Sequence, residues 1–576
     1  MSPLTSWLLA AVLPFQAPTP TPLAAKITEL PMGPASQRVY VSGDGDHLAL
    51  VTPKGSRQVV MIDGAEGPLF DDIPAQTVVQ FSASGGRSGY LGRRGGEIIA
   101  VVDGKEAGAI ATAATSPRGL YVPTSWDFFF NRDGSHLAYG VMSGPDVWTM
   151  SVDGVKGAPF ALIDFAQVAV TAKRVIYVAQ TPDKKWHLVA DGKVGPPYDA
   201  IQSLRVTPDG MHYAFIGTKN GAPNNTMVTV SDGVEGTAGF MQVTDLVLAP
   251  DGRVAYMGLL PPKPGPGEFA PHLIVAGQDL PHIMPFGPGR MKNLPLDNVK
   301  FSPDGKRYAY IQQNTPNPGV TVMVNGKPMG PVYTSVADLF WSPDGSRLAY
   351  PGTSPSGSFL VIDGQEGESY GTIADFSWSP DGKRYAYRGY RATAGGWFLV
   401  LDGKEQPKAR DFSTPVWSPD GKHVAYGASG NTGAQPVVDG AVRPGNLAVW
   451  VVHNPRAVPP LVFPPFSWSP DGNRVAYVSN KSDGTSRAVV YLDATSFEGA
   501  TPSYSYPSWT ADSKRFAVMN YLGTGWSLLV DGKASPRYDA IVENSVAGVR
   551  FIDSHTFRFY GVKAGQLYKV TVDLGG

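Results

Sequence analysis

The 576-residue sequence contains no cysteine and no excess of charge of either sign. Without cysteine the chain can form no disulfide bond, no thiolate metal site and no cysteine nucleophile. Its 48 Lys and Arg residues are balanced by 49 Asp and Glu residues, which gives a net charge of −1. A protein that holds a nucleic-acid backbone needs a basic surplus, so these numbers argue against a nucleic-acid partner.

Long apolar runs are also missing after residue 25, because none approaches the roughly 18 residues that a membrane-spanning helix needs. Residues 1–25 are typical of an export signal: Trp7 to Phe15 is a short apolar stretch, and Ala17 or Ala25 could precede a cleavage site. The alternative is a disordered leader rich in Pro and Thr, since no Lys or Arg occurs before Lys26. We expect a removable leader over 1–25, no transmembrane segment, and a periplasmic or secreted protein.

What the sequence does contain is the phrase Trp-Ser-Pro-Asp-Gly, which recurs at a period near 40 residues, with a further copy that begins at Phe301. Its four copies place the same residue types at Trp341, Asp344, Gly345, Trp378, Asp381, Gly382, Trp417, Asp420, Gly421, Trp468, Asp471 and Gly472. Proline presets a turn, aspartate accepts hydrogen bonds from nearby backbone N–H groups, and glycine takes the left-handed conformation that closes a hairpin. The phrase therefore predicts one tight turn per repeat.

A second turn follows about 20 residues after each phrase, as Asn-Gly or Asp-Gly between apolar runs. Its copies are Asn325-Gly326, Asp363-Gly364, Asp402-Gly403, Asp439-Gly440 and Asp531-Gly532. Two turn signatures and one plainer loop join four strands per repeat, which describes the antiparallel blade of a β-propeller. The Trp residues at the start of the phrases are expected to wedge between adjacent blades.

Counting the turns gives six weaker copies in the first half and seven in the second half of the chain. They centre on Asp44, Ser84, Asp133, Ala172, Asp209 and Asp251, and then on Asp304, Asp344, Asp381, Asp420, Asp471, Asp512 and Asp553. One ring of thirteen blades would leave a wide, unfilled channel, whereas rings of four to eight blades are usual. We therefore expect an all-β chain of two tandem β-propellers, with about six and then about seven four-stranded antiparallel blades.

The spacing of the turns widens between Asp251 and Asp304, around a proline-rich segment at 261–267. This predicts an N-terminal propeller over 26–296 and a C-terminal propeller over 297–576. The alternative is that the proline-rich segment is a long loop within a blade and that the boundary lies one repeat away. The last repeat lacks an outer strand, which residues 26–34 could supply by pairing the two ends of the chain.

The pattern W-S-P-D-G-x-x-x-A-Y, as in Trp341 to Tyr350, resembles the WD40-like (PD40) repeat of TolB-type β-propellers. The same repeat occurs in the propeller domains of prolyl oligopeptidase-like peptidases. The resemblance covers nearly the whole chain after residue 38, is weak around Ser84 and Ala172, and implies a periplasmic or secreted protein-binding role. TolB-like proteins carry a separate α/β domain and the peptidases an α/β-hydrolase domain, and neither is visible in this sequence. What the resemblance carries over is the scaffold.

Two patterns could suggest catalysis. Gly367-Glu368-Ser369-Tyr370-Gly371 matches the G-x-S-x-G nucleophile elbow, which needs a strand, a sharp turn and then a helix. The residues that follow lead into another strand, so we interpret the match as chance. The turn aspartates do not predict calcium binding, because a calcium loop needs several oxygen ligands within one short segment.

Most histidines are explained by their register in the repeat. Those that follow the turn glycine occupy a column otherwise filled by Lys or Arg, and we interpret them as solvated hairpin positions: His47, His136, His212 and His423. His272 and His282 flank a predicted strand, and a metal site there would need further ligands. We assign no catalytic residue, no metal site and no cofactor.

A further pattern, Gly-Pro-x-aromatic-Asp, ends several predicted outer strands. It places Asp71, Tyr198, Asp199, Tyr538 and Asp539 in loops that run from an outer strand to the next inner strand. In a propeller such loops lie on one rim, so these residues are candidates for partner binding. The alternative, which we favour, is that the aspartates form turns that end the outer strand.

The function that best fits these observations is a non-catalytic, extracytoplasmic binding or scaffold protein of the TolB-like propeller type. Repeated cores fix the frame of such a protein, and its loops dock a partner at a propeller face. We expect the partner to be a protein, with a glycan as the alternative. The rival function is a propeller enzyme, such as a polysaccharide lyase or glycan hydrolase, with its active site at a channel mouth.

Overall fold

The computed structural model describes residues 22–575, apart from residues 35–37, 76–77, 113–127, 145–146, 222–223, 238, 261–270, 281–298, 315–318, 431–432, 448–465, 481–487, 494, 499–506, 522–524 and 543–549. Over this described part the chain is all-β, and its one helical turn is the short 3-10 segment η1 (Ala392–Ala394). No helix there is long and apolar enough to cross a membrane. The strands form thirteen sheets, which are the blades of a β-propeller fold. The expected fold class and total number of blades are thus confirmed.

Contacts divide the chain into two compact units, a long unit (Pro31–Ala409) and a terminal unit (Met1–Leu30 with Arg410–Gly576). The long unit holds nine blades. Its strands are, for blade 1, β2 (Arg38–Val41), β3 (Leu48–Lys54), β4 (Arg57–Ile62) and β5 (Ala65–Phe70); for blade 2, β6 (Gln80–Phe81), β7 (Ser88–Arg94), β8 (Glu97–Val102) and β9 (Lys105–Thr112); for blade 3, β10 (Phe129–Phe130), β11 (Leu137–Gly144), β12 (Val147–Val152) and β13 (Val155–Phe160); for blade 4, β14 (Leu162–Val170), β15 (Val175–Gln180), β16 (Trp186–Ala190) and β17 (Lys193–Val194); for blade 5, β18 (Ala200–Val206), β19 (Tyr213–Gly221), β20 (Asn224–Ser231) and β21 (Val234–Glu235); for blade 6, β22 (Gln242–Leu248), β23 (Val254–Leu259), β24 (Pro271–Val275) and β25 (Gln278–Leu280); for blade 7, β26 (Val299–Phe301), β27 (Tyr308–Gln313), β28 (Val320–Val324) and β29 (Lys327–Tyr333); for blade 8, β30 (Ser335–Val336), β31 (Phe340–Trp341), β32 (Leu348–Ser354), β33 (Gly357–Ile362) and β34 (Gln365–Tyr370); and for blade 9, β35 (Thr372–Trp378), β36 (Tyr385–Arg391), β37 (Gly396–Leu401) and β38 (Lys404–Glu405).

The terminal unit holds the other four blades. Its strands are, for blade 10, β39 (Asp411–Phe412), β40 (Val416–Trp417), β41 (Val424–Gly430), β42 (Gly433–Val438) and β43 (Ala441–Val442); for blade 11, β44 (Asn446–Leu447), β45 (Phe466–Trp468), β46 (Val475–Asn480), β47 (Ala488–Leu492) and β48 (Thr495–Glu498); for blade 12, β49 (Ser508–Trp509), β50 (Phe516–Tyr521), β51 (Trp526–Val530) and β52 (Lys533–Ala534); and for blade 13, β53 (Ala540–Ile541), β54 (Arg550–Phe551), β55 (Thr556–Lys563), β56 (Gln566–Asp573) and β1 (Lys26–Pro34). In blades 8, 10, 11 and 13 the first strand comes in two pieces that pair with the same neighbour.

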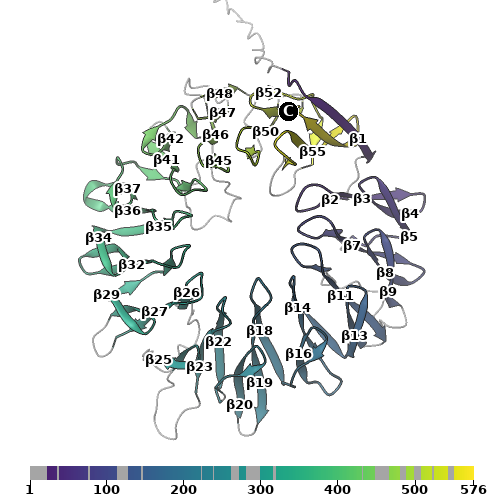
Figure 1. The fold of residues 1–576 in the computed structure, drawn as a ribbon, viewed down its shortest axis with the longest axis horizontal. Helices are drawn as coiled ribbons and strands as arrows, with labels where there is room; N and C mark the ends of the chain where they lie inside the picture. Colours follow the sequence, from purple (N-terminus) through teal and green to yellow (C-terminus); the bar gives the residue numbers. More distant parts are fainter. Residues whose placement is uncertain are drawn as a thin grey trace, which may run out of the picture. The chain divides into compact units, whose positions relative to one another are not determined.

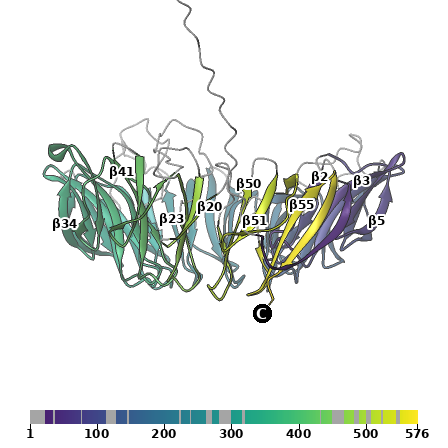
Figure 2. The ribbon, with the colours of Figure 1, turned by 90° about the horizontal axis from the view of Figure 1, so that it is seen from above.

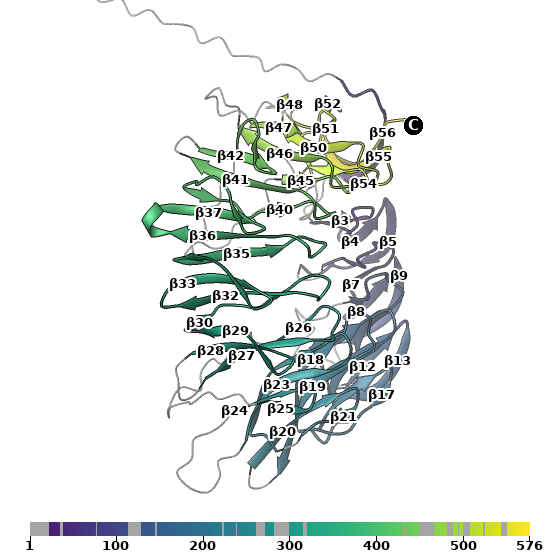
Figure 3. The same cartoon turned by 60° about the vertical axis from the view of Figure 1, so that its left-hand side comes forward.

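Within each unit, consecutive blades pack face to face, so their hydrophobic clusters lie between two blades. Tyr308 and Tyr310 pack in the cluster shared with blade 6, whereas Ala309, between them in sequence, packs in the cluster shared with blade 8. Strand alternation sends these side chains to opposite faces, and the small alanine lets the next sheet approach. Within the long unit, blades 7, 8 and 9 lie one above another in Figure 3 through β27, β32 and β36.

Inner and outer strands of the long unit occupy opposite edges of the row of blades. Figure 1 shows the first strands β14, β18, β22 and β26 along one edge, with outer strands such as β5, β9 and β13 along the other. Strands of this unit, such as β3, β5 and β34, run between two faces in Figure 2. The turns therefore gather on those faces, where a partner can reach them.

The first turn of the repeat folds as its sequence predicts. In blade 9 the Ser379 hydroxyl donates to Asp381 Oδ1 at 2.6 Å, and the Lys383 N–H donates to the same oxygen at 3.1 Å. Gly382 has a φ of +71°, and a Cβ added there would lie 3.2 Å from Oδ1 of Asp344 in the preceding turn. Glycine is thus required both by its backbone conformation and by the stacking of consecutive turns.

The repeated tryptophans join consecutive blades, as expected. The Trp378 indole N–H of blade 9 donates to the Phe340 carbonyl oxygen of blade 8 at 3.0 Å, and the Arg347 guanidinium lies 5.0 Å from the centre of a Trp378 ring. Equivalent indole bonds run from Trp341, Trp468 and Trp509 to Lys300, Val416 and Ser467. The rings are half-buried, because one edge stays open to solvent beside the turn.

Replacing Trp378 by alanine is expected to lower the free energy of unfolding of the long unit by about 2–4 kcal/mol, since ring packing and one hydrogen bond are lost. Trp378→Phe is the matched control, because Phe301 holds this place in blade 7, and it should cost about 1 kcal/mol. Denaturant titration measures both values. An unchanged unfolding free energy in Trp378→Ala would show that the ring does not hold blades 8 and 9 together.

Buried tyrosines form a second link between blades, which the repeated turn phrases do not predict. Tyr370 of blade 8 is 2% exposed, packs against Gly389 of blade 9, and donates its hydroxyl to Glu405 of blade 9 at 2.6 Å. The same arrangement joins Tyr198 to Glu235 at 2.7 Å and Tyr333 to Glu366 at 2.8 Å. A buried phenol needs an acceptor, and a glutamate on the outer strand of the next blade supplies it.

The two ends of the chain complete blade 13 together. Strand β1 pairs with β56, as expected for residues 26–34, and takes the place of the outer strand. Glu29 accepts the Tyr538 hydroxyl at 2.7 Å, so it repeats the role of Glu405. Leu23, Ala25 and Ile27 pack on the cluster shared by blades 12 and 13.

Two expectations fall on residues outside the described part of the chain. Most of the expected leader, 1–25, is not described, although Pro22 to Ala25 are. The boundary expected at residue 296 lies in the segment 281–298, which is also not described. On either side of that segment, blades 6 and 7 share one hydrophobic cluster, and both belong to the long unit. Because residue 296 lies outside the described residues, the division into 26–296 and 297–576 stays a prediction.

Candidate functional site

The aromatic residues proposed from sequence as rim contacts point into the fold. Tyr198 is 2% exposed and Tyr538 is 1% exposed, and each donates its hydroxyl to a glutamate. Burial, and then the hydrogen bond to that glutamate, raises the pKa of both tyrosines. Their rings serve the packing between blades, although Tyr198 also lines a cleft described below.

The three aspartates of the same pattern lie nearer to solvent and hold local contacts. Asp71 accepts the N–H of Gly95, and Asp539 accepts that of Ala564, at 2.9 and 2.7 Å. Each bond ties the end of an outer strand to a hairpin of the next blade. Asp199 accepts the Lys185 ammonium group at 2.7 Å. Each aspartate belongs to a different blade, so the pattern marks a repeated position in the fold.

The histidines in the Lys/Arg column are more than solvated hairpin positions. Their Nδ1 atoms lie 2.5–2.8 Å from the aspartate of the second turn in the same blade, in the pairs His47–Asp63, His136–Asp153, His212–Asp232 and His423–Asp439. Arg347 and Arg384 pair in the same way with Asp363 and Asp402. The column therefore cross-links the two turns of a blade, because a cation or an imidazole N–H faces a carboxylate there.

Two of the other sequence candidates, Ser369 and His272, make contacts within their own blades. Ser369 lies on β34, its hydroxyl donates to the Ser356 carbonyl oxygen at 3.1 Å, and strand β35 follows directly. His272 Nδ1 lies 2.7 Å from Asp279, while His282 is outside the described residues. Over the described part of the chain, no group of three or more His, Cys, Asp or Glu residues is arranged to hold a metal ion.

Blade 4 interrupts the repeat. Its first turn is closed by a hydrogen bond from the Thr171 N–H to the Arg174 carbonyl oxygen at 2.8 Å, with only Ala172 and Lys173 between them. Most other blades have four residues at this point, including the Pro-Asp-Gly of blade 7, and blades 6 and 13 have three. One cleft lies on each side of blade 4, and Arg174 at the end of the shortened turn lines both. Cleft A, towards blade 3, has a volume of about 320 Å³, and cleft B, towards blade 5, of about 340 Å³.

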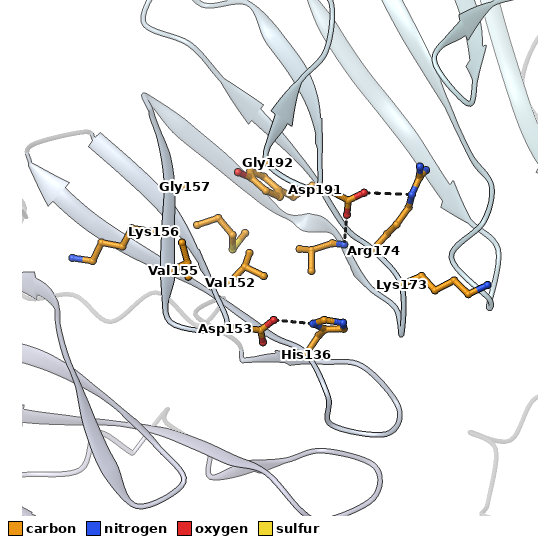
Figure 4. A pocket seen from close by; sticks show the side chains of 13 residues that line it. His136, Val152, Asp153, Val155, Lys156, Gly157, Lys173, Arg174, Asp191 and Gly192 are labelled. Carbon is orange, nitrogen blue, oxygen red and sulfur yellow. Dashed lines mark hydrogen bonds and ion pairs between the residues drawn. The ribbon is translucent and has the colours of Figure 1, made fainter.

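Cleft A has an apolar floor and charged walls (Figure 4). Met150, Val175 and Tyr177 form the floor, each at most 6% exposed. Burial raises the pKa of Tyr177 to about 12, so its phenol stays protonated. Val155 stands at the rim and is 72% exposed.

The charges of cleft A divide into paired and unpaired groups. His136 pairs with Asp153 at 2.8 Å, and Arg174 pairs with Asp191 at 3.4 Å. Asp191 also accepts the N–H of Val175 at 3.1 Å. Lys156 and Lys173 extend from opposite ends of the group of side chains in Figure 4. Lys156 stands where blades 5, 8 and 9 carry Glu235, Glu366 and Glu405.

Cleft B shares Arg174 and Asp191 with cleft A. Leu188, Phe215 and Val230 give it an apolar floor, and each is at most 5% exposed. Lys193 and Val194 stand at its rim. The only signal of these clefts in the sequence is the weak copy of the repeat at Ala172.

A third groove, of about 330 Å³, lies on the inner strands of blades 7, 8 and 9. It is lined by aromatic side chains, including Phe340, Trp341, Phe376 and Trp378, with Lys300 beside them. Aromatic rings in a groove offer flat apolar faces for stacking.

No protein-family model matches this chain, and no curated protein matches it. Among solved structures it is similar to TolB from Acinetobacter baumannii, at 14% identity over 57% of this chain and 79% of that chain, with a TM-score of 0.19. It is also similar to the β-propeller domain of the Trilobed protease from Pyrococcus furiosus, at 13% identity over 65% and 95%, with a TM-score of 0.21. A structure described as that of the eukaryotic initiation factor gives 11% identity over 65% and 88%, with a TM-score of 0.29. Overlaps of this size carry no argument about function, and the propeller fold rests on the strand pairing of the chain itself.

Proposed function

We propose that this chain is a non-catalytic binding protein of the TolB-type, PD40-repeat kind that works outside the cytoplasm and docks a protein at a face of its blades. The observation that carries the proposal is the pair of clefts beside blade 4, the blade whose repeat is interrupted, each with an apolar floor and charged side chains at its walls. Pockets of this size with a few polar groups are typical binding sites.

The ionisable groups of the repeat support a scaffold rather than a reaction centre. Arginines, histidines and aspartates of the turns pair with one another inside each blade. The Ser469 hydroxyl and neighbouring turn groups lower the pKa of Asp471 to about 2, and Ser379 likewise lowers that of Asp381. A carboxyl group that acts as a general acid near neutral pH needs a raised pKa. These carboxylates are held ionised, as turn formers.

The location outside the cytoplasm and the repeat family rest on the sequence. A leader cleaved after Ala17 would leave Leu23 and Ala25, which pack on blades 12 and 13, in the mature chain. Such a leader and the absence of cysteine suit an exported chain. The W-S-P-D-G turns, whose hydrogen bonds recur in blade after blade, support the PD40 assignment.

The test compares binding and turnover with the full chain. The purified protein is cross-linked with the exported fraction of its source and is separately incubated with neutral and acidic polysaccharides. We expect a saturable cross-linked complex with a protein and no release of new sugar ends. Steady release of sugar products, lost when residues that line one cleft are replaced, would contradict the proposal and favour the rival enzyme function.

A further inference from the structure

We infer that clefts A and B form one docking surface for an extended peptide segment in which acidic and apolar side chains alternate. This inference rests on the proposed function and names the chemistry of the partner. The docking surface is defined by Val155 and Lys156 of blade 3, Lys173 and Arg174 of blade 4, and Lys193 and Val194 at its outer strand.

The shortened turn of blade 4 removes an acidic group from this surface. In blade 7 the equivalent turn carries Asp304, whose carboxylate is exposed and has a lowered pKa, first because of the Ser302 hydroxyl. Blade 4 has no residue at that place, and Lys173 occupies the corner of its turn. The face of blade 4 thus loses one negative charge while it keeps its positive one.

The outer strands add to the same imbalance of charge. Lys156 and Val194 occupy the position that is glutamate in blades 5, 8 and 9. No carboxylate of the described residues lies within ion-pair distance of the ammonium groups of Lys156 and Lys193. The chain as a whole has a net charge of −1. The surplus of lysine is therefore confined to local surfaces such as this one.

The acidic groups that face the surface are already engaged. Asp153 and Asp191 hold His136 and Arg174. Asp209 of blade 5 has a lowered pKa, first through the Thr207 hydroxyl, with a smaller contribution from Lys173. The Lys173 ammonium group lies 3.2 Å from the Met211 sulfur. An incoming carboxylate would therefore meet Lys156 and Lys193 without displacing an existing partner.

Exposed valines give the surface its apolar part. Val155 is 72% exposed, Val194 46% and Val234 71%, and they stand on β13, β17 and β21 of three consecutive blades. In blades 8 and 9 the residues after the second-turn glycine are Gln365 and Lys404. Val155 and Val194 are each next to a lysine in sequence, and exposed apolar side chains beside cations fit a peptide that alternates apolar and acidic residues.

A peptide fits better than an acidic glycan. The floors of both clefts are aliphatic or aromatic and buried, with Met150, Val175 and Leu188 among them. Branched and aliphatic side chains of a peptide can fill such pockets, whereas a sugar ring would leave its hydroxyl groups unpaired there. Binding of an acidic glycan is therefore included in the test as the alternative result.

The test measures binding of fluorescein-labelled twelve-residue peptides to the full chain. One peptide alternates Glu and Leu, a second alternates Lys and Leu, a third alternates Glu and Ser, and an oligogalacturonate serves as the glycan probe. We expect the Glu-Leu peptide to bind at least about tenfold more tightly than the other three, and its binding to weaken with added salt.

Variants then locate the site. The double change Lys156→Glu with Lys193→Glu should weaken binding of the Glu-Leu peptide at least about tenfold, which is a loss of about 1.4 kcal/mol. Lys404→Glu is the matched control, because Lys404 holds the position of Lys193 in blade 9, and it should bind like the original protein. Val155→Asp is the second variant, and it should weaken binding without a change of melting temperature, since Val155 is 72% exposed.

Three results would overturn the inference. The first is that the Lys156→Glu/Lys193→Glu protein binds the Glu-Leu peptide as tightly as the original protein does. The second is that Lys404→Glu weakens this binding as much as the double change does. The third is that the oligogalacturonate binds more tightly than the Glu-Leu peptide. In these cases a cross-linked protein partner would still leave the proposed function standing. Turnover of a polysaccharide would instead remove the proposed function itself, so the two failures are distinguishable.

Discussion

A chain that lacks residues 1–34 is expected to lose about 5 kcal/mol or more of the unfolding free energy of its terminal unit, a large share of the stability of a typical domain. The reason is that β1 supplies the outer strand of blade 13. Its loss exposes an edge of β56, removes Leu23, Ala25 and Ile27 from the cluster with blades 12 and 13, and leaves the buried Tyr538 hydroxyl without Glu29.

Shorter deletions provide the controls for this experiment. Deleting 1–17 should leave the unfolding free energy unchanged, because the first described contact is the hydrogen bond from the Leu23 N–H to the Ala534 carbonyl oxygen. Deleting 1–25 should give an intermediate loss, since Leu23 and Ala25 go while Glu29 stays. Denaturant titration followed by tryptophan fluorescence measures all three. Equal stability of the 1–34 and 1–17 deletions would show that β1 does not close blade 13.

Gly389→Ala is expected to destabilise the long unit by about 3–5 kcal/mol, which is large for the addition of one methyl group. The added Cβ would lie 2.3 to 2.6 Å from ring atoms of Tyr370. That ring is held by packing and by its hydrogen bond to Glu405, so it has little room to move. The backbone of Gly389 is not in the left-handed region, and the effect therefore reports packing alone.

Two further variants separate packing from general sensitivity to substitution. Gly371→Ala, one residue after Tyr370, would place a Cβ 3.4 Å from the nearest atom, the Tyr390 carbonyl oxygen, and should cost less than about 1 kcal/mol. Combining Gly389→Ala with Tyr370→Leu should recover part of the loss, because the smaller side chain makes room. If Gly389→Ala melts like the original chain, the close contact between ring and glycine does not hold these blades.

Local chemistry explains why the turns and blades could be predicted from sequence. Proline, aspartate and glycine specify the turn at Asp381 through contacts within a few residues, and the same contacts are found in the structure. The alternation of Tyr308, Ala309 and Tyr310 likewise needs only the geometry of one strand. Features that depend on a few neighbouring residues can therefore be predicted from a short sequence motif.

The link between tyrosine and glutamate was missed because its two partners lie about 35 residues apart in sequence, as with Tyr370 and Glu405. The sequence did hold a signal for it. Tyr198, Tyr333 and Tyr370 are each followed, one blade later, by a glutamate two residues after the second-turn glycine, whereas Phe160 is followed by Val194. The correspondence is not strict, because Phe70 is followed by Glu106, which pairs with Arg94. A glutamate at this place can therefore accept a tyrosine hydroxyl or pair with a cation.

The clefts could not be predicted because their lining residues come from neighbouring blades and lie far apart in the sequence. A shortened turn at Ala172 looks like a weak copy of the repeat, and its consequence depends on what blades 3 and 5 present on either side. Lys156 and Lys193 can be assigned to neighbouring clefts only once β13 and β17 are known to belong to consecutive blades.

Hydrogen exchange of the full chain, alone and in complex with its cross-linked protein partner, tests the central claim most directly. We expect slowed exchange in β13, in the turn at Thr171 to Arg174 and in β17, with no change at the matching strands β34 and β38 of blades 8 and 9. Protection confined to other blades, with these segments unchanged, would contradict docking beside blade 4.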